Sequence, residues 1–145
     1  MSSTAPVTLE VAAGVLQQAT GRVLIAQRPA SKHAGGAWEF PGGKLEPGES
    51  PRAGLERELR EELGIQVLEA QSLMDYSHCY PDREIHLHVF RVTRWSGEPV
   101  GLEDQPLRWM AVGELLQAGL LPADEPIVQA LARLSKSSAR RGYPP

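Results

Sequence analysis

Three glutamates lie close together near the middle of the chain, at Glu58, Glu61 and Glu62. This spacing would put all three carboxylates on one face of an α-helix. Like charges so placed repel one another, so a helix built only for stability would place Lys or Arg among them. Carboxylate oxygens are the preferred ligands of hard divalent cations. The cluster therefore predicts a site for Mg²⁺ or Mn²⁺.

Residues on either side of the cluster could complete such a site. Gly42 and Gly43 precede the helix, and a glycine lets a backbone carbonyl approach a metal because it has no side chain. Glu49 could reach the same ion or orient a ligand. Arg57 lies four residues before Glu61 and could orient its carboxylate.

The alternative interpretation is an ordinary solvated acidic face. Its charges would be neutralised by pairs four residues apart, Arg57 with Glu61 and Glu56 with Arg60. On the helix alone this interpretation has the advantage, and the glycines of the preceding loop shift the balance toward a metal site.

The segment 42–65 reads GGKLEPGESPRAGLERELREELGI. In order, its fixed positions are Gly43, five residues, Glu49, seven residues, Arg57-Glu58-Leu59, one residue, Glu61-Glu62, one residue, and Gly64-Ile65. This spacing resembles the Nudix box at every fixed position. The resemblance implies the Nudix fold, an α/β/α sandwich with a mixed β-sheet and a catalytic loop–helix–loop. It also implies hydrolysis of a nucleoside diphosphate linked to another group.

Segments outside the box resemble the MutT branch of the Nudix hydrolases. They are Arg28-Pro29, Lys32-His33, 38–43, 80–83, 95–99, Gln105-Pro106, Trp109-Met110 and 122–126. The likeness extends over about residues 9–134 and implies hydrolysis of 8-oxo-dGTP to 8-oxo-dGMP and pyrophosphate. Such an enzyme clears oxidised nucleotides from the pool of DNA precursors and so prevents mutation.

The resemblance also implies a role for individual residues. The metal set is the backbone of Gly42 or Gly43 together with Glu58, Glu61, Glu62 and Glu103, while Glu49 and Arg57 join these glutamates as catalytic residues. Water attacks the β-phosphorus. Glu58 is the first candidate for the general base and Glu103 is the second.

The implied nucleotide-binding residues are Arg28, His33, Phe40, Arg83 and Asp124. Phe40 has the planar apolar surface that a purine needs, and its alternative role is a core aromatic at the end of a strand. Both arginines could equally be surface charges.

Asp124 departs from the best-known MutT pattern, which has Asn at this place. An amide can both accept from N7–H and donate to O6 of 8-oxoguanine, whereas an ionised carboxylate only accepts. Asp124 would therefore have to be protonated, through a pKa raised by burial. It could instead accept from a cytosine amino group, which favours a modified pyrimidine triphosphate such as 5-hydroxy-dCTP, or serve as the N-cap of the last helix.

Two other functions remain open. A module that binds nucleotides without cleaving them should have lost one or more of the box glutamates, and all are present here. A Nudix hydrolase of ADP-ribose or dinucleoside polyphosphates usually carries further motifs downstream of the box, and none is visible.

The elements that must position these residues follow from hydrophobic periodicity. Apolar segments at 7–16 and 22–27 predict two strands joined as a hairpin. Ser50 as N-cap, Pro51 in the first turn and Gly64 at the end delimit a helix. Its core stripe consists of Leu55, Leu59 and Leu63. Further strands are predicted at 65–80, 84–93 and 107–112, and helices at 114–118 and 125–134.

The composition limits the class of protein. The chain has 145 residues, which predicts one domain over 1–134, followed by a basic tail at 135–145 that we expect to be disordered. A net charge of −3 argues against binding duplex nucleic acid, and no segment is apolar enough to cross a membrane. A single cysteine and an N-terminus unlike a secretory signal favour the cytoplasm. We expect a monomer whose partner is a small nucleotide.

A second metal site is conceivable around the histidines. His86 and His88 share one face of a predicted strand, and His78 is followed by Cys79. A mixed His and Cys zinc site would need more ligands than this pattern supplies, because the chain has no second cysteine. Histidines with ordinary hydrogen bonds on a strand are the better interpretation.

Overall fold

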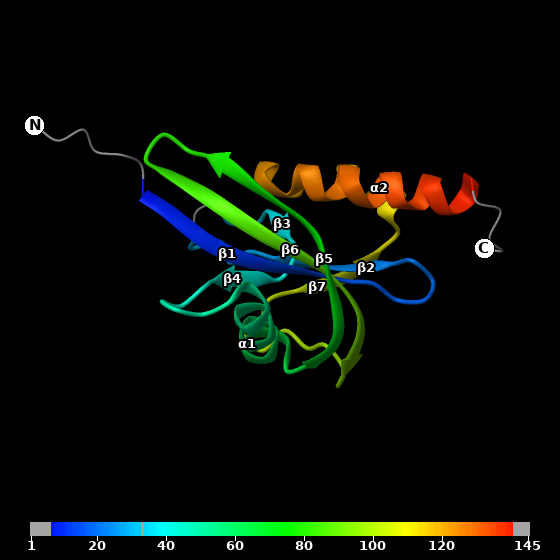
Figure 1. The fold of residues 1–145 in the computed structure, drawn as a ribbon, viewed down its shortest axis with the longest axis horizontal. Coiled ribbons are helices and arrows are strands. Elements are labelled where there is room, and N and C mark those ends of the chain that lie inside the picture. Colours follow the sequence, from blue (N-terminus) through cyan, green and yellow to red (C-terminus); the bar gives the residue numbers. More distant parts are fainter. Residues whose placement is uncertain (1–6, 33, 141–145) are drawn as a thin grey trace, which may run out of the picture.

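The structure is a computed structural model that describes residues 7–32 and 34–140. Its elements are β1 (Val7–Leu16), β2 (Val23–Gln27), β3 (Trp38–Glu39), β4 (Gly42–Lys44), α1 (Pro51–Leu63), β5 (Gln66–Cys79), β6 (Arg83–Ser96), β7 (Leu107–Met110), the 3₁₀ helices η1 (Val112–Gln117) and η2 (Pro122–Asp124), and α2 (Glu125–Arg140). The strands form two sheets, ordered β4-β1-β6-β5 and β3-β2-β7. The two α-helices lie on opposite sides of the strands (Figure 1). The predicted α/β architecture with a mixed sheet is confirmed.

The predicted hairpin of the first two strands is wrong. β1 is paired with β4 on one edge and with β6 on the other, so neither edge is free for β2. β2 lies in the second sheet between β3 and β7, and only an isolated bridge from Gln17 to Val23 joins it to the end of β1. β2 is buried over most of its length and β1 over its second half, so the backbone of each needs a partner on both edges there.

The helix that carries the glutamates forms as the sequence predicts. The Ser50 hydroxyl accepts a hydrogen bond from the Ala53 amide at 3.2 Å, and Gly64 ends the helix with a φ of 70°. Three leucines of its apolar stripe are fully buried: Leu55, Leu59 and Leu63. They pack against Ala12 and Leu16 of β1. The helix is therefore held against the sheet whose edge strand, β4, contains Gly42 and Gly43.

The central strands β1 and β6 are parallel and in register from Val7–Arg83 to Leu16–Val92. Side chains along each strand alternate between the two faces of the sheet. Leu9 and Val11 of β1 line a cavity, as do Ile85 and Leu87 of β6. Glu10 lies between the two β1 residues, and it therefore projects from the other face.

The C-terminal part differs from prediction in detail. β7 ends at Met110, the predicted helix at 114–118 is the 3₁₀ helix Val112–Gln117, and α2 continues to Arg140. The helix thus extends into the segment predicted as a tail, and no glycine or proline lies in residues 135–140. Residues 141–145 lie outside the described part of the chain. No helix among the residues described is long and apolar enough to cross a membrane.

Candidate active site

A cavity of about 650 Å³ gathers residues from most of the chain. The predicted site residues in its wall are Arg28, Phe40, Gly42, Gly43, Glu58, Glu61, Glu62, Arg83, Glu103 and Asp124. Glu49 and Arg57 lie outside this wall and contact it from behind Glu58. His33 is not among the described residues. The carboxylate cluster and the predicted base-binding residues therefore border one space.

Glu62 is the member of the carboxylate cluster whose ionisation is opposed by its surroundings. Burial is the main cause that raises its pKa to about 8, and the charges of Glu58, Glu103 and Glu39 add to it. Its carboxylate accepts one hydrogen bond, from the Gly42 amide at 3.2 Å. No Lys or Arg among residues 7–32 and 34–140 forms an ion pair with it.

This electrostatic environment fits a divalent cation. Several carboxylates face one cavity, and the half-buried Glu62 has no cationic partner in the described part of the chain. Oxygen ligands of this kind suit Mg²⁺ and Mn²⁺ rather than softer metals. The geometry therefore favours a metal site over the solvated acidic face, and Glu56 pairs with Arg52 at 3.3 Å instead of with Arg60.

The two glycines are needed for close packing as well as for backbone access. A Cβ on Gly43 would lie 2.5 Å from the Glu58 carboxylate, and a Cβ on Gly42 would lie 2.0 Å from the Ala12 carbonyl oxygen. Both distances are far below van der Waals contact. Glycine at these positions lets β4 lie directly against β1 and close to Glu58 of α1.

Arg57 holds the acidic residues in place. Its guanidinium donates to both oxygens of Glu49 at 2.8 and 2.9 Å, to Glu58 at 2.9 Å and to the Lys44 carbonyl at 3.0 Å. The bond to Glu61, which the sequence predicts, is longer at 3.3 Å. The hydrogen bonds from Arg57, and after them the one from the Glu46 amide, lower the pKa of Glu49 to about 2. Glu49 thus fastens Arg57, which in turn orients Glu58.

Glu103 is positioned by a loop tied to the end of α1. The Leu102 amide donates to the Glu62 carbonyl at 3.0 Å, and the Gln105 side chain donates to the same carbonyl at 3.2 Å. Gln105 also accepts from the Glu103 amide at 2.8 Å. Sequence reasoning assigns no positioning role to Gln105, because its partner lies 43 residues away.

Asp124 lies at the other end of the cavity wall and is 5% exposed. Its Oδ2 accepts from the Phe40 amide at 3.1 Å, so this carboxyl joins η2 to the segment after β3 rather than capping α2. Its pKa is raised to about 7, mainly by burial; the Phe40 amide opposes the rise and the charge of Glu39 adds to it. Phe40 packs in the core, as its alternative role requires, and it also borders the cavity.

Other residues complete this end of the wall. Arg28 pairs with Glu39 at 3.0 Å, and burial raises the pKa of Glu39. The Arg83 guanidinium lies 5.3 Å from the centre of the Tyr80 ring. The Tyr76 hydroxyl donates to the Ala123 carbonyl, next to Asp124. Sequence reasoning missed Glu39 and Tyr76, because only the folded chain brings them to this end of the site.

Comparison with known proteins agrees with this geometry. The family model described as NUDIX domain matches residues 12–130. This chain belongs to the Nudix family. The prediction of a Nudix hydrolase with MutT-like relatives is confirmed.

Individual relatives cover most of this Nudix chain. It is 42% identical to a protein of Escherichia coli (strain K12) named CTP pyrophosphohydrolase, over 87% of this chain and 93% of the relative. It is 39% identical to the 8-oxo-dGTP diphosphatase of the same strain, over 87% of this chain and 98% of the relative. The solution structure of the E. coli ORF135 protein matches with a TM-score of 0.81 and 40% identity, covering 91% of this chain and 94% of that one.

Proposed function

We propose that this Nudix protein is a metal-dependent nucleoside triphosphate pyrophosphohydrolase that converts 8-oxo-dGTP to 8-oxo-dGMP and pyrophosphate. The observation that carries the proposal is the buried Asp124, which borders the same cavity as the carboxylate cluster. The name of the 39% identical relative supports the same activity. By hydrolysing the oxidised nucleotide, the enzyme would remove it from the pool of DNA precursors and so prevent mutation.

Mg²⁺, or Mn²⁺ in its place, would be held by Glu58, Glu61, Glu62 and Glu103 and by the backbone of Gly42 or Gly43. When bound, the ion would screen the phosphate charges and lower the pKa of the attacking water. Arg57 keeps Glu58 in position through the bond at 2.9 Å. Glu58, with Glu103 as the second choice, takes a proton from the water as it attacks the β-phosphorus. The bond between the β-phosphorus and the oxygen that bridges it to the α-phosphate breaks, so the nucleoside monophosphate leaves with this oxygen and the water oxygen stays on the pyrophosphate.

Protonated Asp124 would read the oxidised base. A neutral carboxyl has one donor and one acceptor, which match O6 and N7–H of 8-oxoguanine. Guanine presents acceptors at both O6 and N7, so the carbonyl oxygen of the same carboxyl would face a lone pair. A pKa of about 7 makes the neutral form available at physiological pH. Phe40, also in the cavity wall, would pack against the base.

A second candidate substrate class is supported by the 42% identical relative, which is named CTP pyrophosphohydrolase. Ionised Asp124 would accept a hydrogen bond from the amino group of cytosine or 5-hydroxycytosine. The metal site and the chemistry of the phosphates would be the same in both cases. The two cases would differ only in the protonation state of Asp124 and in the shape of the part of the cavity that binds the base, around Asp124 and Phe40.

The test is a comparison of pyrophosphate release in Mg²⁺ from 8-oxo-dGTP, dGTP, 5-hydroxy-dCTP and CTP, each at one concentration well below KM. Preference for 8-oxo-dGTP over dGTP by a factor of ten or more would support the first proposal. Preference for either cytosine nucleotide would replace it with the second. The absence of pyrophosphate from all four would contradict both and favour a different Nudix substrate.

A further inference from the structure

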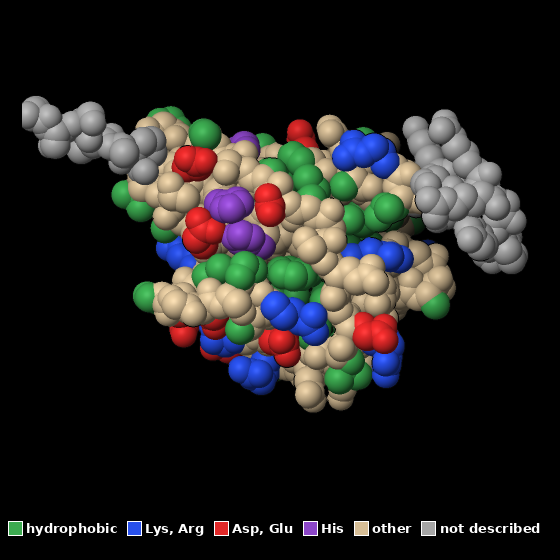
Figure 2. Space-filling view, in the orientation of Figure 1, with side chains coloured by type: hydrophobic (Ala, Val, Ile, Leu, Met, Phe, Trp, Pro, Cys, Tyr) green, Lys and Arg blue, Asp and Glu red, His purple; other side chains and the backbone are tan. Residues whose placement is uncertain are grey.

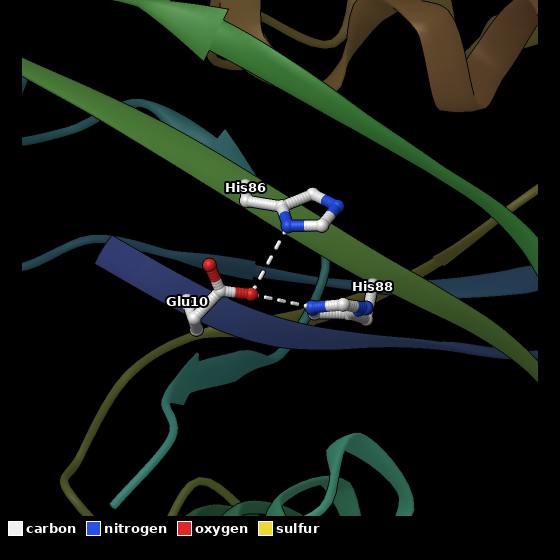
Figure 3. A group of neighbouring side chains, drawn as sticks. All are labelled: Glu10, His86 and His88. Atoms are coloured by element: carbon white, nitrogen blue, oxygen red, sulfur yellow. Dashed lines mark hydrogen bonds and ion pairs between the residues drawn. The ribbon is translucent and has the colours of Figure 1, made fainter. Parts of the chain in front are cut away.

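A cluster of imidazoles and a carboxylate lies on the sheet face that points away from the cavity. Glu10 of β1 is paired in register with His86 of β6, and His88 follows two residues later on the same face. Figure 3 shows both rings directed toward the Glu10 carboxylate, and Figure 2 shows histidine and acidic side chains together on this surface.

The donor atoms of these three side chains are close enough to share one ion. Glu10 Oε1 lies 3.0 Å from His86 Nδ1 and 2.8 Å from His88 Nε2. All the potential ligand atoms lie within 4.8 Å of one another. Two ligands of a single zinc ion, at bond lengths near 2.0–2.2 Å, are separated by roughly 3–3.5 Å. Rotation of the side chains by small angles would therefore open the cluster around a metal.

The surroundings also suit a metal centre. Asp75 of β5 places a carboxylate oxygen 3.8 Å from His86 Nε2, the ring nitrogen opposite to the one that faces Glu10. This is an ion-pair distance and not a hydrogen bond, but a small movement of the exposed Asp75 side chain would let it accept from Nε2, as carboxylates behind metal-binding histidines do. The side chains of His86 and His88 are 33% and 18% exposed, so an ion can reach them from solvent.

We propose that Glu10, His86 and His88 form a second metal site, which binds a divalent transition metal such as Zn²⁺. Two imidazoles and one carboxylate favour zinc over Mg²⁺, whereas the cavity offers only oxygen ligands. Three protein ligands leave further coordination positions open to water. Bound metal would join the two central parallel strands on the outer face of the sheet.

The sequence pattern does not reveal this set. It places the two histidines on one face, but Glu10 lies 78 residues from His88. The mixed His and Cys site considered from the sequence is not formed. His78 pairs in register with Ile85, and Cys79 is exposed and outside the metal-binding group found among the described residues.

The test is zinc binding by calorimetry to the full chain without an affinity tag, in an excess of Mg²⁺ that saturates the cavity. We expect one zinc ion per chain. His88→Gln and Glu10→Gln should each weaken binding at least tenfold. His78→Gln is the matched control, because it removes a histidine of the neighbouring strand that lies outside the cluster, and it should bind zinc as tightly as the unaltered chain.

A second measurement keeps the test decisive if a variant folds poorly. NMR spectra of the histidine ring nitrogens in the unaltered chain should show shifts for His86 and His88 at one equivalent of zinc, with His78 unchanged. Failure to bind zinc in Mg²⁺, equal binding by His88→Gln, or shifts confined to other histidines would each overturn the proposal. The three side chains would then be a surface network of hydrogen bonds and ion pairs only.

Discussion

Replacing Asp124 by Asn should make the protein more stable at alkaline pH, because it removes a buried group that resists ionisation. In the unfolded chain this carboxyl ionises near its ordinary pKa of 3.8, and in the folded protein it ionises near 7. Between these values the folded state holds a proton that the unfolded state has lost. The contribution of Asp124 to stability is therefore fully present below the unfolded pKa and is lost as the pH rises through about 7.

The size of the effect follows from the two pKa values. Their difference corresponds to roughly 4 kcal/mol of unfolding free energy over the whole range. Roughly 2–3 kcal/mol of this is lost between about pH 5 and pH 8. Asn has nearly the same shape, and its carbonyl can accept the hydrogen bond from the Phe40 amide.

Urea unfolding of both proteins at about pH 5 and pH 8, with a chelator present, measures this effect. The stability of Asp124→Asn relative to the unaltered chain should rise by roughly 2–3 kcal/mol between the two values. Titrating groups that do not interact with Asp124, Glu62 included, are common to both proteins and cancel in the difference, whereas the coupling of Asp124 to Glu39 is part of the measured effect. A difference that changes by less than roughly 0.5 kcal/mol would refute the raised pKa of Asp124.

The same variant tests how the base is read. If neutral Asp124 recognises 8-oxoguanine, the ratio of kcat/KM for 8-oxo-dGTP to that for dGTP should fall in the unaltered enzyme as the pH passes about 7. In Asp124→Asn the ratio should be independent of pH, since an amide keeps its donor and acceptor. Parallel pH profiles for the two enzymes would show that Asp124 does not read the base.

Four other substitutions test the catalytic end and its support. Gly43→Ala should lower kcat at least tenfold, because its Cβ would displace the Glu58 carboxylate, whereas Gly113→Ala, where a Cβ meets nothing within 4 Å, should leave kcat unchanged. Glu58→Gln should abolish turnover but retain nucleotide binding by calorimetry, and near-normal turnover would rule out Glu58 as the base. Arg57→Lys should lower kcat more than it raises KM, because an ammonium cannot make the paired contacts of the guanidinium. Leu59→Ala should cost about 2–5 kcal/mol in urea unfolding, because this side chain is fully buried.

The carboxylate cluster could be predicted from the sequence because its geometry is local. Ser50 and Gly64 fix the ends of α1, and the helical repeat then decides which side chains share a face. The spacing of the Nudix box adds Gly42 and Gly43 to the predicted metal site. What the spacing does not supply is the bidentate contact of Arg57 with Glu49, eight residues away, which depends on how the loop folds back against the helix.

The base end of the site was less predictable because it depends on pairing between distant segments. Asp124 meets Phe40 across 84 residues, and no local pattern sets which backbone amide a buried carboxyl will find. The predicted hairpin failed for the same reason. A turn after β1 allows β2 to return beside it, but the parallel pairing of β1 with β6 occupies the edge that a hairpin would need.

That parallel pair also explains how one sheet can carry two kinds of chemistry. Alternate residues of β1 and β6 point to opposite faces, so apolar residues such as Leu9 and Leu87 line the cavity while Glu10 and His88 meet on the outside. A slip of one residue between the strands would exchange these faces and place charges against the nucleotide. Burial of the apolar face therefore fixes the register, and the register in turn brings an acid and two imidazoles together on the outer surface.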